Sequence, residues 1–300
     1  MKSLFQKTSS GWVKYSKYEL KESGDGQLYI TPSPKSKPTI YDPLENPDVM
    51  VIDALNVGLL CMNRSAEADV KSAVMEFVSK YGLMGFITAL PTTPNFMDYE
   101  AAYFPKNHFI RDESMASQDY AMLFFPFEKP DFHTSKGETV WNLNNTREMM
   151  ALAMAMDGKA IAQNMSFQNS YAESYNWLVT QFRDWAFSFA SSFLYYEDYD
   201  SLDDVTLSLY RQGMSAFGGI APSYHIELLD KPTIVWDFHS LLLGIQMMLS
   251  FMLTDDKKPL RICRHCQRAF AASHPNAVFC SSKCKNQFNV YKSRAKNNKE

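Results

Sequence analysis

The chain has 300 residues, of which 46% are hydrophobic and 14% aromatic, and its formal net charge at pH 7 is −3. This composition is ample for a buried core, and the length allows one large domain and one small one. No apolar run near the N-terminus resembles a secretory signal peptide, which argues against disulfides among the five cysteines and predicts a cytoplasmic location.

The N-terminal segment, about residues 1–45, is expected to be rich in β-strands. Segments 12–20 and 27–31 have strand character, and prolines indicate a loop over 32–38. In the apolar run 49–62 we interpret Asp53 and Asn56 as capping residues, with a polar pair as the alternative. A helix with an apolar inner face then ends before Gly82 (inner face: Val70, Val74, Phe77, Val78, Tyr81).

Residues 83–145 contain many prolines and aromatic side chains. We expect short helices and strands there, and we favour ordinary aromatic packing over an aromatic binding groove. A helix-rich half begins at Thr146, where residues 147–164 are rich in Met and Ala and are broken by Asp157-Gly158. A second helix, over 171–196, repeats aromatic and aliphatic residues at helical spacing, which indicates a core helix (Tyr171, Tyr175, Leu178, Phe182, Trp185, Phe189, Phe193).

Five acids lie within 197–204, and a helix is predicted over 202–215. Segments 224–229 and 233–236 predict a hairpin, and 239–253 an apolar core helix that is too short to span a membrane. We expect His239 to be a satisfied core or capping histidine. Together these elements predict an α+β fold class, a mainly helical body over 1–256 with short strands and hairpins, and a treble-clef-like four-cysteine zinc finger over 257–300.

Four cysteines fall within 22 positions near the C-terminus: Cys263, Cys266, Cys280 and Cys284. Two close pairs of thiolates separated by a spacer are typical of a tetrahedral zinc site. Four thiolates leave no open coordination position, so the predicted Zn²⁺ is structural. His265 or His274 could replace one cysteine as a ligand. Ser281 or Ser282 is expected to cap a helix that carries Cys284.

Charge is distributed unevenly along the chain. Eleven of the 30 Lys and Arg residues but one of the 33 acids fall in 257–300, so this segment carries +10 and the remainder −13. Such asymmetry favours a polyanion-binding module, with DNA or RNA as partner. The candidate contacts lie on the finger and its basic helix: Lys285, Asn286, Asn289, Lys292, Arg294, Lys296, Arg264 and Arg268. The alternative is a finger that docks on the acidic body or on a protein partner.

The run Phe279-Cys280-Ser281-Ser282-Lys283-Cys284-Lys285-Asn286-Gln287, preceded by Cys263-x-x-Cys266, resembles the C-terminal CGNR zinc finger of bacterial proteins. The eponymous Cys-Gly-Asn-Arg reads Cys284-Lys285-Asn286-Gln287 here, so the four cysteines and Asn286 are what the resemblance carries over. The run Val51 to Asn56, followed by a helix ending at Tyr81-Gly82-Leu83, resembles the ABATE domain that usually precedes this finger. The resemblance implies a transcription regulator that binds DNA through its finger.

No nucleophile–base pair, catalytic metal spacing or cofactor loop rises above background, so we do not predict an enzyme. We expect no membrane contact and identify no small-molecule ligand. A homodimer is compatible with the sequence. The function classes left open are a nucleic-acid-binding regulator and a zinc-stapled interaction or structural protein.

Overall fold

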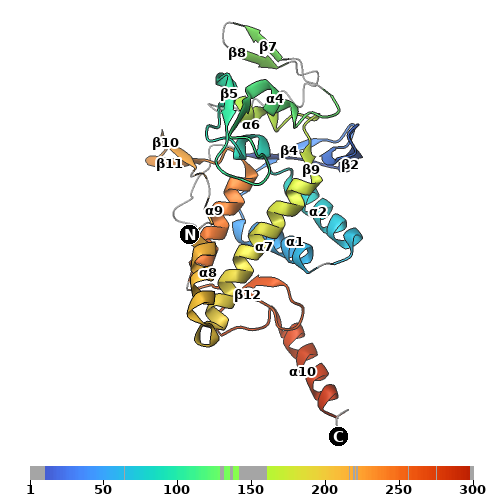
Figure 1. Ribbon diagram of the computed structural model, residues 1–300, viewed down its shortest axis with the longest axis vertical. Helices are drawn as coiled ribbons and strands as arrows, with labels where there is room; N and C mark the ends of the chain where they lie inside the picture. Colours follow the sequence, from blue (N-terminus) through green and yellow to red (C-terminus); the bar gives the residue numbers. More distant parts are fainter. Residues whose placement is uncertain are drawn as a thin grey trace. The chain divides into compact units, whose positions relative to one another are not determined.

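The computed structural model describes residues 11–63, 65–128, 132–135, 138–141, 161–215, 217–218, 220, 222–255, 257–274 and 276–297 (Figure 1). The chain forms two compact units, each assembled from separate segments. The first unit comprises residues 1–47, 71–180 and 219–246, and the second comprises 48–70, 181–218 and 247–300. The C-terminal finger therefore shares its unit with earlier parts of the chain.

The described strands of the first unit form small antiparallel sheets. β1 (Trp12–Tyr15) pairs with β4 (Pro38–Tyr41), and β3 (Leu28–Pro32) lies between β2 (Tyr18–Glu22) and β9 (Glu173–Ser174). Three hairpins complete the set: β5 (Ala101–Tyr103) with β6 (Ser114–Ala116), β7 (Phe132–Ser135) with β8 (Glu138–Trp141), and β10 (Ser223–Leu228) with β11 (Pro232–Asp237).

Of the two expectations for the N-terminal residues, one is wrong and one is confirmed. The single strand predicted over 12–20 is broken at Ser16, whose N–H donates to the carbonyl of Lys37, so β1 and β2 join different sheets. The loop predicted over 32–38 is confirmed, because it connects β3, which ends at Pro32, to β4, which begins at Pro38.

Helices account for much of the rest of the described chain: α1 (Pro47–Met62), α2 (Glu67–Tyr81), α3 (Phe86–Ala89), α4 (Ser117–Met122), α6 (Ile161–Met165), α7 (Tyr175–Glu197), α8 (Asp204–Ser215), α9 (Leu241–Leu253) and α10 (Ser282–Asn297), with the 3₁₀ turns η1 (Phe96–Asp98) and η2 (Tyr199–Ser201). The predicted α+β class is confirmed. Most of the Met- and Ala-rich segment 147–164 lies outside the described residues. No described helix is long and apolar enough to cross a membrane.

An aromatic core in the first unit explains many of the aromatic residues in 83–145. Tyr120 is fully buried, and its ring packs edge-on against Phe96 and Phe124 at centroid distances of 4.9 and 5.3 Å. Phe124 in turn stacks on Tyr171. For these residues the packing interpretation is therefore confirmed.

One buried carboxylate organises the turn that leads into α3. Glu173 is fully buried and accepts hydrogen bonds from the N–H groups of Met84, Gly85 and Phe86 and from the Tyr171 hydroxyl, at 2.6 to 3.0 Å. Gly85 has φ +77°, which an L side chain rarely adopts. Burial raises the pKa of Glu173, although its four hydrogen bonds act in the opposite direction.

The second unit brings α1 against the C-terminal part of α7. The predicted aromatic stripe is buried at Phe182, Trp185 and Phe189. Gly58 of α1 lies so close to α7 that a Cβ there would overlap the carbonyl oxygen of Phe182. Asp53 and Asn56 lie within α1, so the capping interpretation is wrong for both, since a cap stands at a helix end.

His239 and Ser240 precede α9. The Nε2 atom of His239 lies 3.0 Å from the Ser223 hydroxyl, so the histidine has a partner as predicted, but it is half-buried and does not belong to the core. Ser240 supplies the helix cap, because its Oγ accepts the N–H of Leu243 at 3.1 Å.

Candidate metal centre and basic helix

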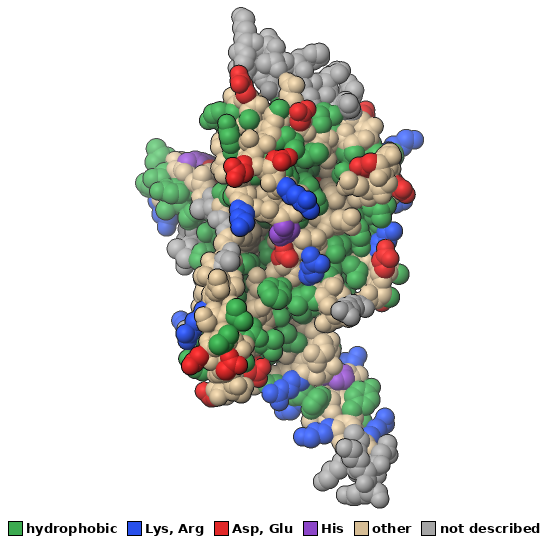
Figure 2. Space-filling model, viewed as in Figure 1, with side chains coloured by type: hydrophobic (Ala, Val, Ile, Leu, Met, Phe, Trp, Pro, Cys, Tyr) green, Lys and Arg blue, Asp and Glu red, His purple; other side chains and the backbone are tan. Residues whose placement is uncertain are grey.

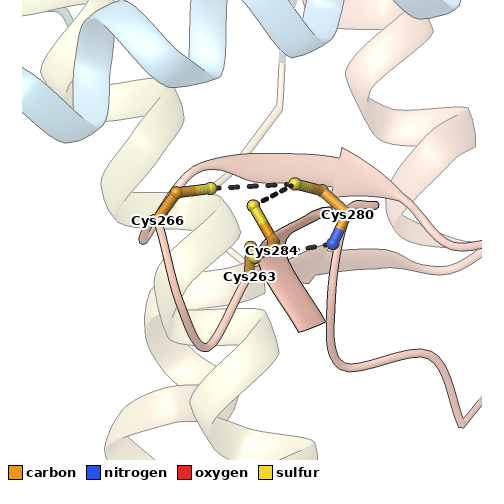
Figure 3. Close-up of side chains that lie close together, drawn as sticks. All are labelled: Cys263, Cys266, Cys280 and Cys284. Carbon is orange, nitrogen blue, oxygen red and sulfur yellow. Dashed lines mark hydrogen bonds between the residues drawn. The ribbon is translucent and has the colours of Figure 1, made fainter. Parts of the chain in front are cut away.

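Four cysteine sulfurs converge at the start of the finger (Figure 3). Cys263 and Cys266 flank a turn between β12 (Leu260–Ile262) and β13 (Ala269–Ala271), and Cys280 and Cys284 lie at the start of α10. All four Sγ atoms lie within 4.8 Å of one another. Among the described residues, this is the group of Cys, His, Asp and Glu side chains that could hold a metal ion.

Local backbone structure positions each pair of sulfurs. In the first turn, the N–H of Gln267 donates to the carbonyl of Cys263, and Gln267 adopts the left-handed region with φ +59°. At the second pair, the Ser281 hydroxyl accepts the N–H of Cys284 at 3.2 Å, so Ser281 is the N-cap that the sequence offered as one of two candidates. The cap places Cys284 in the first helical turn, facing Cys280.

The spacing of the sulfurs fits a tetrahedral tetrathiolate site. With metal–sulfur bonds of about 2.3 Å, the edges of such a tetrahedron are about 3.8 Å. The observed Cys266–Cys280 and Cys280–Cys284 Sγ distances are 3.7 and 3.5 Å. These separations are much longer than a disulfide bond of about 2.05 Å, and all four thiols are free. The donor set and its geometry therefore fit zinc.

The thiols differ in acidity. Burial raises the pKa of Cys263, but hydrogen bonds from the backbone N–H groups of Cys266, Cys280 and His265 outweigh it and lower the pKa to about 6. Burial and the neighbouring thiols raise the pKa of Cys280 to about 12, and burial also raises that of Cys266. The backbone thus stabilises one thiolate, and a bound cation would stabilise the others.

Neither candidate histidine ligand joins the described sulfur cluster. The Nε2 atom of His265 lies 3.0 Å from the Gln287 side-chain oxygen, and its imidazole stacks on Tyr291. His274 is exposed on the loop that follows β13. The expectation that His265 or His274 could replace a cysteine is therefore not supported by the geometry.

One face of the finger docks on the helices of its own unit. The side-chain amide of Asn56 pairs with the main chain of Ala269 in both directions: its Oδ1 accepts the N–H at 2.9 Å, and its Nδ2 donates to the carbonyl at 3.3 Å. Arg261 forms an ion pair with Glu197 at 3.1 Å and lies over the Phe193 ring. The sequence placed Asn56 in the ABATE-like run but carried no signal for this contact, because 213 positions separate the partners.

The basic helix presents its charges to solvent. The described cations of the finger are exposed at Arg264, Arg268, Lys283, Lys285, Lys292 and Arg294, as are Asn286 and Asn289. In the part of the chain that the structure describes, none of these six cations forms an ion pair with the exposed acids of 197–204. The side chain of Lys296 lies outside the described residues. Figure 2 shows Lys and Arg side chains around the finger, next to a histidine and apolar side chains.

A second feature of this unit had no signal in the sequence. An apolar groove of about 580 Å³ lies along α7 and α8, and Phe187, Leu209 and Phe217 are among the residues that line it. The sequence predicts the residues of α8 only as part of a helix and does not predict a groove.

Comparisons with protein-family models, with curated proteins and with solved structures found no match for this chain. The fold and the site define the chain as an α+β protein with a C-terminal four-cysteine cluster of zinc-finger type. The likeness to CGNR fingers rests on the sequence motif described above.

Proposed function

We propose that this protein is a zinc-binding, nucleic-acid-binding transcription regulator that grips DNA or RNA through its C-terminal finger. The observation that carries the proposal is a helix held at a four-sulfur centre with its lysines and arginines exposed. Zinc at this centre is structural, since four thiolates complete the coordination sphere.

The charge of the finger supports a polyanionic partner. Residues 257–300 carry +10 on a chain whose remainder carries −13, so the basic charge is concentrated in one module. Exposed Lys285, Lys292 and Arg294 lie on α10, and Arg264 and Arg268 lie at the turn beside it. Cations clustered in this way bind phosphates and release counterions, which provides affinity without sequence specificity. Asn286 and Asn289 are the exposed amides available for contacts with base edges.

A second candidate function is supported by the Arg261–Glu197 ion pair. In this contact a cation of the finger pairs with an acid of the second unit, as expected for a finger that docks on the protein itself. It involves β12, however, and leaves α10 exposed. We therefore infer that the β12–β13 face anchors the finger to its own unit and that α10 binds the partner.

The test is nucleic-acid binding by the full zinc-loaded chain. Fluorescence anisotropy with labelled DNA and RNA at about 50 mM salt should detect a complex held by about three to five phosphate contacts. The triple change Lys285→Ala, Lys292→Ala and Lys296→Ala should abolish binding and retain zinc. A matched control is the triple change Lys17→Ala, Lys106→Ala and Lys231→Ala, which removes three exposed lysines of the first unit and should leave affinity unchanged.

Absence of binding to both DNA and RNA near this salt concentration would refute the regulator proposal. Equal loss of binding in the control variant would mean that the overall charge of the chain, and not the finger, sets affinity. If neither nucleic acid binds and the triple variant instead weakens a protein complex, the interaction function stands in its place.

A further inference from the structure

An aromatic pair lies among the cations of the finger. The rings of His265 and Tyr291 are nearly parallel, with an interplanar angle of 21° and centroids 5.8 Å apart. His265 comes from the turn between the first two cysteines, and Tyr291 comes from the third turn of α10. The turn between Cys263 and Cys266 and the helix that carries Cys284 thus bring the two rings into contact.

Tyr291 is not part of the finger's small core. Its exposed fraction is 58%, whereas Phe288, one turn earlier, is partly buried against Phe279 at 5.2 Å. A tyrosine with one face supported by imidazole and more than half of its surface open is an aromatic platform. Each ring has an exposed cation as its neighbour in sequence: Lys292 follows Tyr291, and Arg264 precedes His265.

We propose that Tyr291, supported by His265, stacks on an unpaired base, so that the finger prefers single-stranded nucleic acid to duplex. The inference rests on the proposed nucleic-acid function and specifies its substrate class. Bases in a duplex have their faces covered by neighbouring bases and offer only their edges, whereas unpaired bases expose the faces that aromatic side chains bind. The surrounding lysines and arginines would track the phosphates of the same strand.

The geometry also explains the role of Gln287. Its side-chain oxygen lies 3.0 Å from Nε2 of His265 and so holds the imidazole against the tyrosine. Gln287 is a positioning residue for the stack. It occupies the position where the CGNR motif has arginine, so this chain has an uncharged group supporting an aromatic ring at that point.

The experiment compares oligothymidylate, oligouridylate and a duplex of equal length by anisotropy, using the full zinc-loaded chain. Tyr291→Ala should weaken binding to the single strands about 5- to 150-fold, the range for removal of a base-stacking aromatic. Binding to the duplex should change by less than about twofold. Tyr291→Phe should retain single-strand affinity, because the ring face remains.

Val290→Ala is the matched control. Val290 is adjacent on α10 and has an exposed fraction of 47%, so its truncation tests the effect of removing an exposed apolar side chain. The salt dependence of single-strand binding should be the same in Tyr291→Ala as in the wild type, because the phosphate contacts remain, and shallower in Lys285→Ala/Lys292→Ala.

Photocrosslinking of the unmodified protein gives a second readout that does not depend on a variant folding. A single strand that carries 4-thiouracil should crosslink to Tyr291 or His265, as identified by mass spectrometry. Crosslinks that exclude both residues, or a Tyr291→Ala variant that weakens single strand and duplex equally or neither, would overturn the inference. If the wild type binds the duplex through its lysines in these cases, the proposed function survives; if it binds no strand, both fail.

Discussion

The contact between Asn56 and Ala269 predicts that a residue of α1 stabilises the finger. Ala269 lies on β13, an edge of a two-stranded sheet, and is 3% exposed. Its N–H and carbonyl both pair with the Asn56 amide. Replacing Asn56 with alanine removes two hydrogen bonds and leaves a buried N–H without its acceptor.

The magnitude follows from these groups. An unsatisfied buried backbone donor costs about 1–3 kcal/mol, and each lost hydrogen bond contributes about 0.5–1.5 kcal/mol. Alanine in a helix interior gains about 0.5 kcal/mol over asparagine, which offsets part of the loss. We expect a net destabilisation of the finger of about 2 kcal/mol, equivalent to about 30-fold in its opening equilibrium.

Hydrogen exchange measures this opening directly. The amides of Cys263 and Arg264 donate to Arg268 and Val278 within the finger, so they exchange when the finger opens. In Asn56→Ala both should exchange about 30-fold faster. Asn289→Ala is the control, because it makes the same change at an exposed position of α10 and gains the same helix propensity. A change of less than about twofold in Asn56→Ala would refute the reasoning.

Three further predictions concern the metal and the two units. Cys280→Ser should lose stoichiometric zinc and unfold the finger, as measured by elemental analysis and circular dichroism, whereas Cys61→Ser should retain the metal because Cys61 lies outside the sulfur cluster. Glu173→Gln should destabilise the first unit by about 1–3 kcal/mol in urea unfolding, because an amide NH₂ would face a buried N–H donor. Burial raises the pKa of Glu173, so ionisation of this side chain opposes folding. The stability of the wild type relative to Glu173→Gln should therefore be greatest below pH 4.5 and should decline as the pH rises through the raised pKa. A stability advantage of the wild type that grows with pH would contradict this sign. Gly58→Ala should cost about 1–3 kcal/mol through overlap with α7, whereas Gly213→Ala on open α8 should be neutral or stabilising, and equal effects would contradict the close helix contact.

Elements with a strong local period were predictable from the sequence. The aromatic stripe of α7 has regular helical spacing, and the hairpin β10–β11 has turn residues between its strands. Both occur close to where they are expected, although the helix begins at Tyr175, because Glu173–Ser174 form β9, and so excludes Tyr171. The convergence of the cysteines was likewise predictable, because two short-range pairs carry most of the geometry. In each case the signal lies within a few residues of the structure that it specifies.

Contacts between distant segments were not predictable in this way. Asn56 reads as a capping residue from its neighbours alone, yet its partner lies 213 positions away. No local motif distinguishes Glu173, yet three consecutive backbone N–H groups near residue 85 donate hydrogen bonds to it in the core. The break between β1 and β2 also depends on a distant partner, the carbonyl of Lys37. Local propensity carries no information about such partners.

The two faces of the finger have different chemistry, and this difference links its structure to its proposed function. The β12–β13 face makes its polar contacts inward, through Arg261 to Glu197 and through Ala269 to Asn56. The helical face leaves Lys285 and Lys292 exposed although acids are available in the same unit. Arg261 shows that a finger cation can pair with those acids, so the solvent exposure of the α10 lysines reflects the orientation of the helix. An orientation set by the metal centre and Asn56 would keep these cations available to a polyanion, and loosening the Asn56 contact should therefore weaken nucleic-acid binding without removing a single charge.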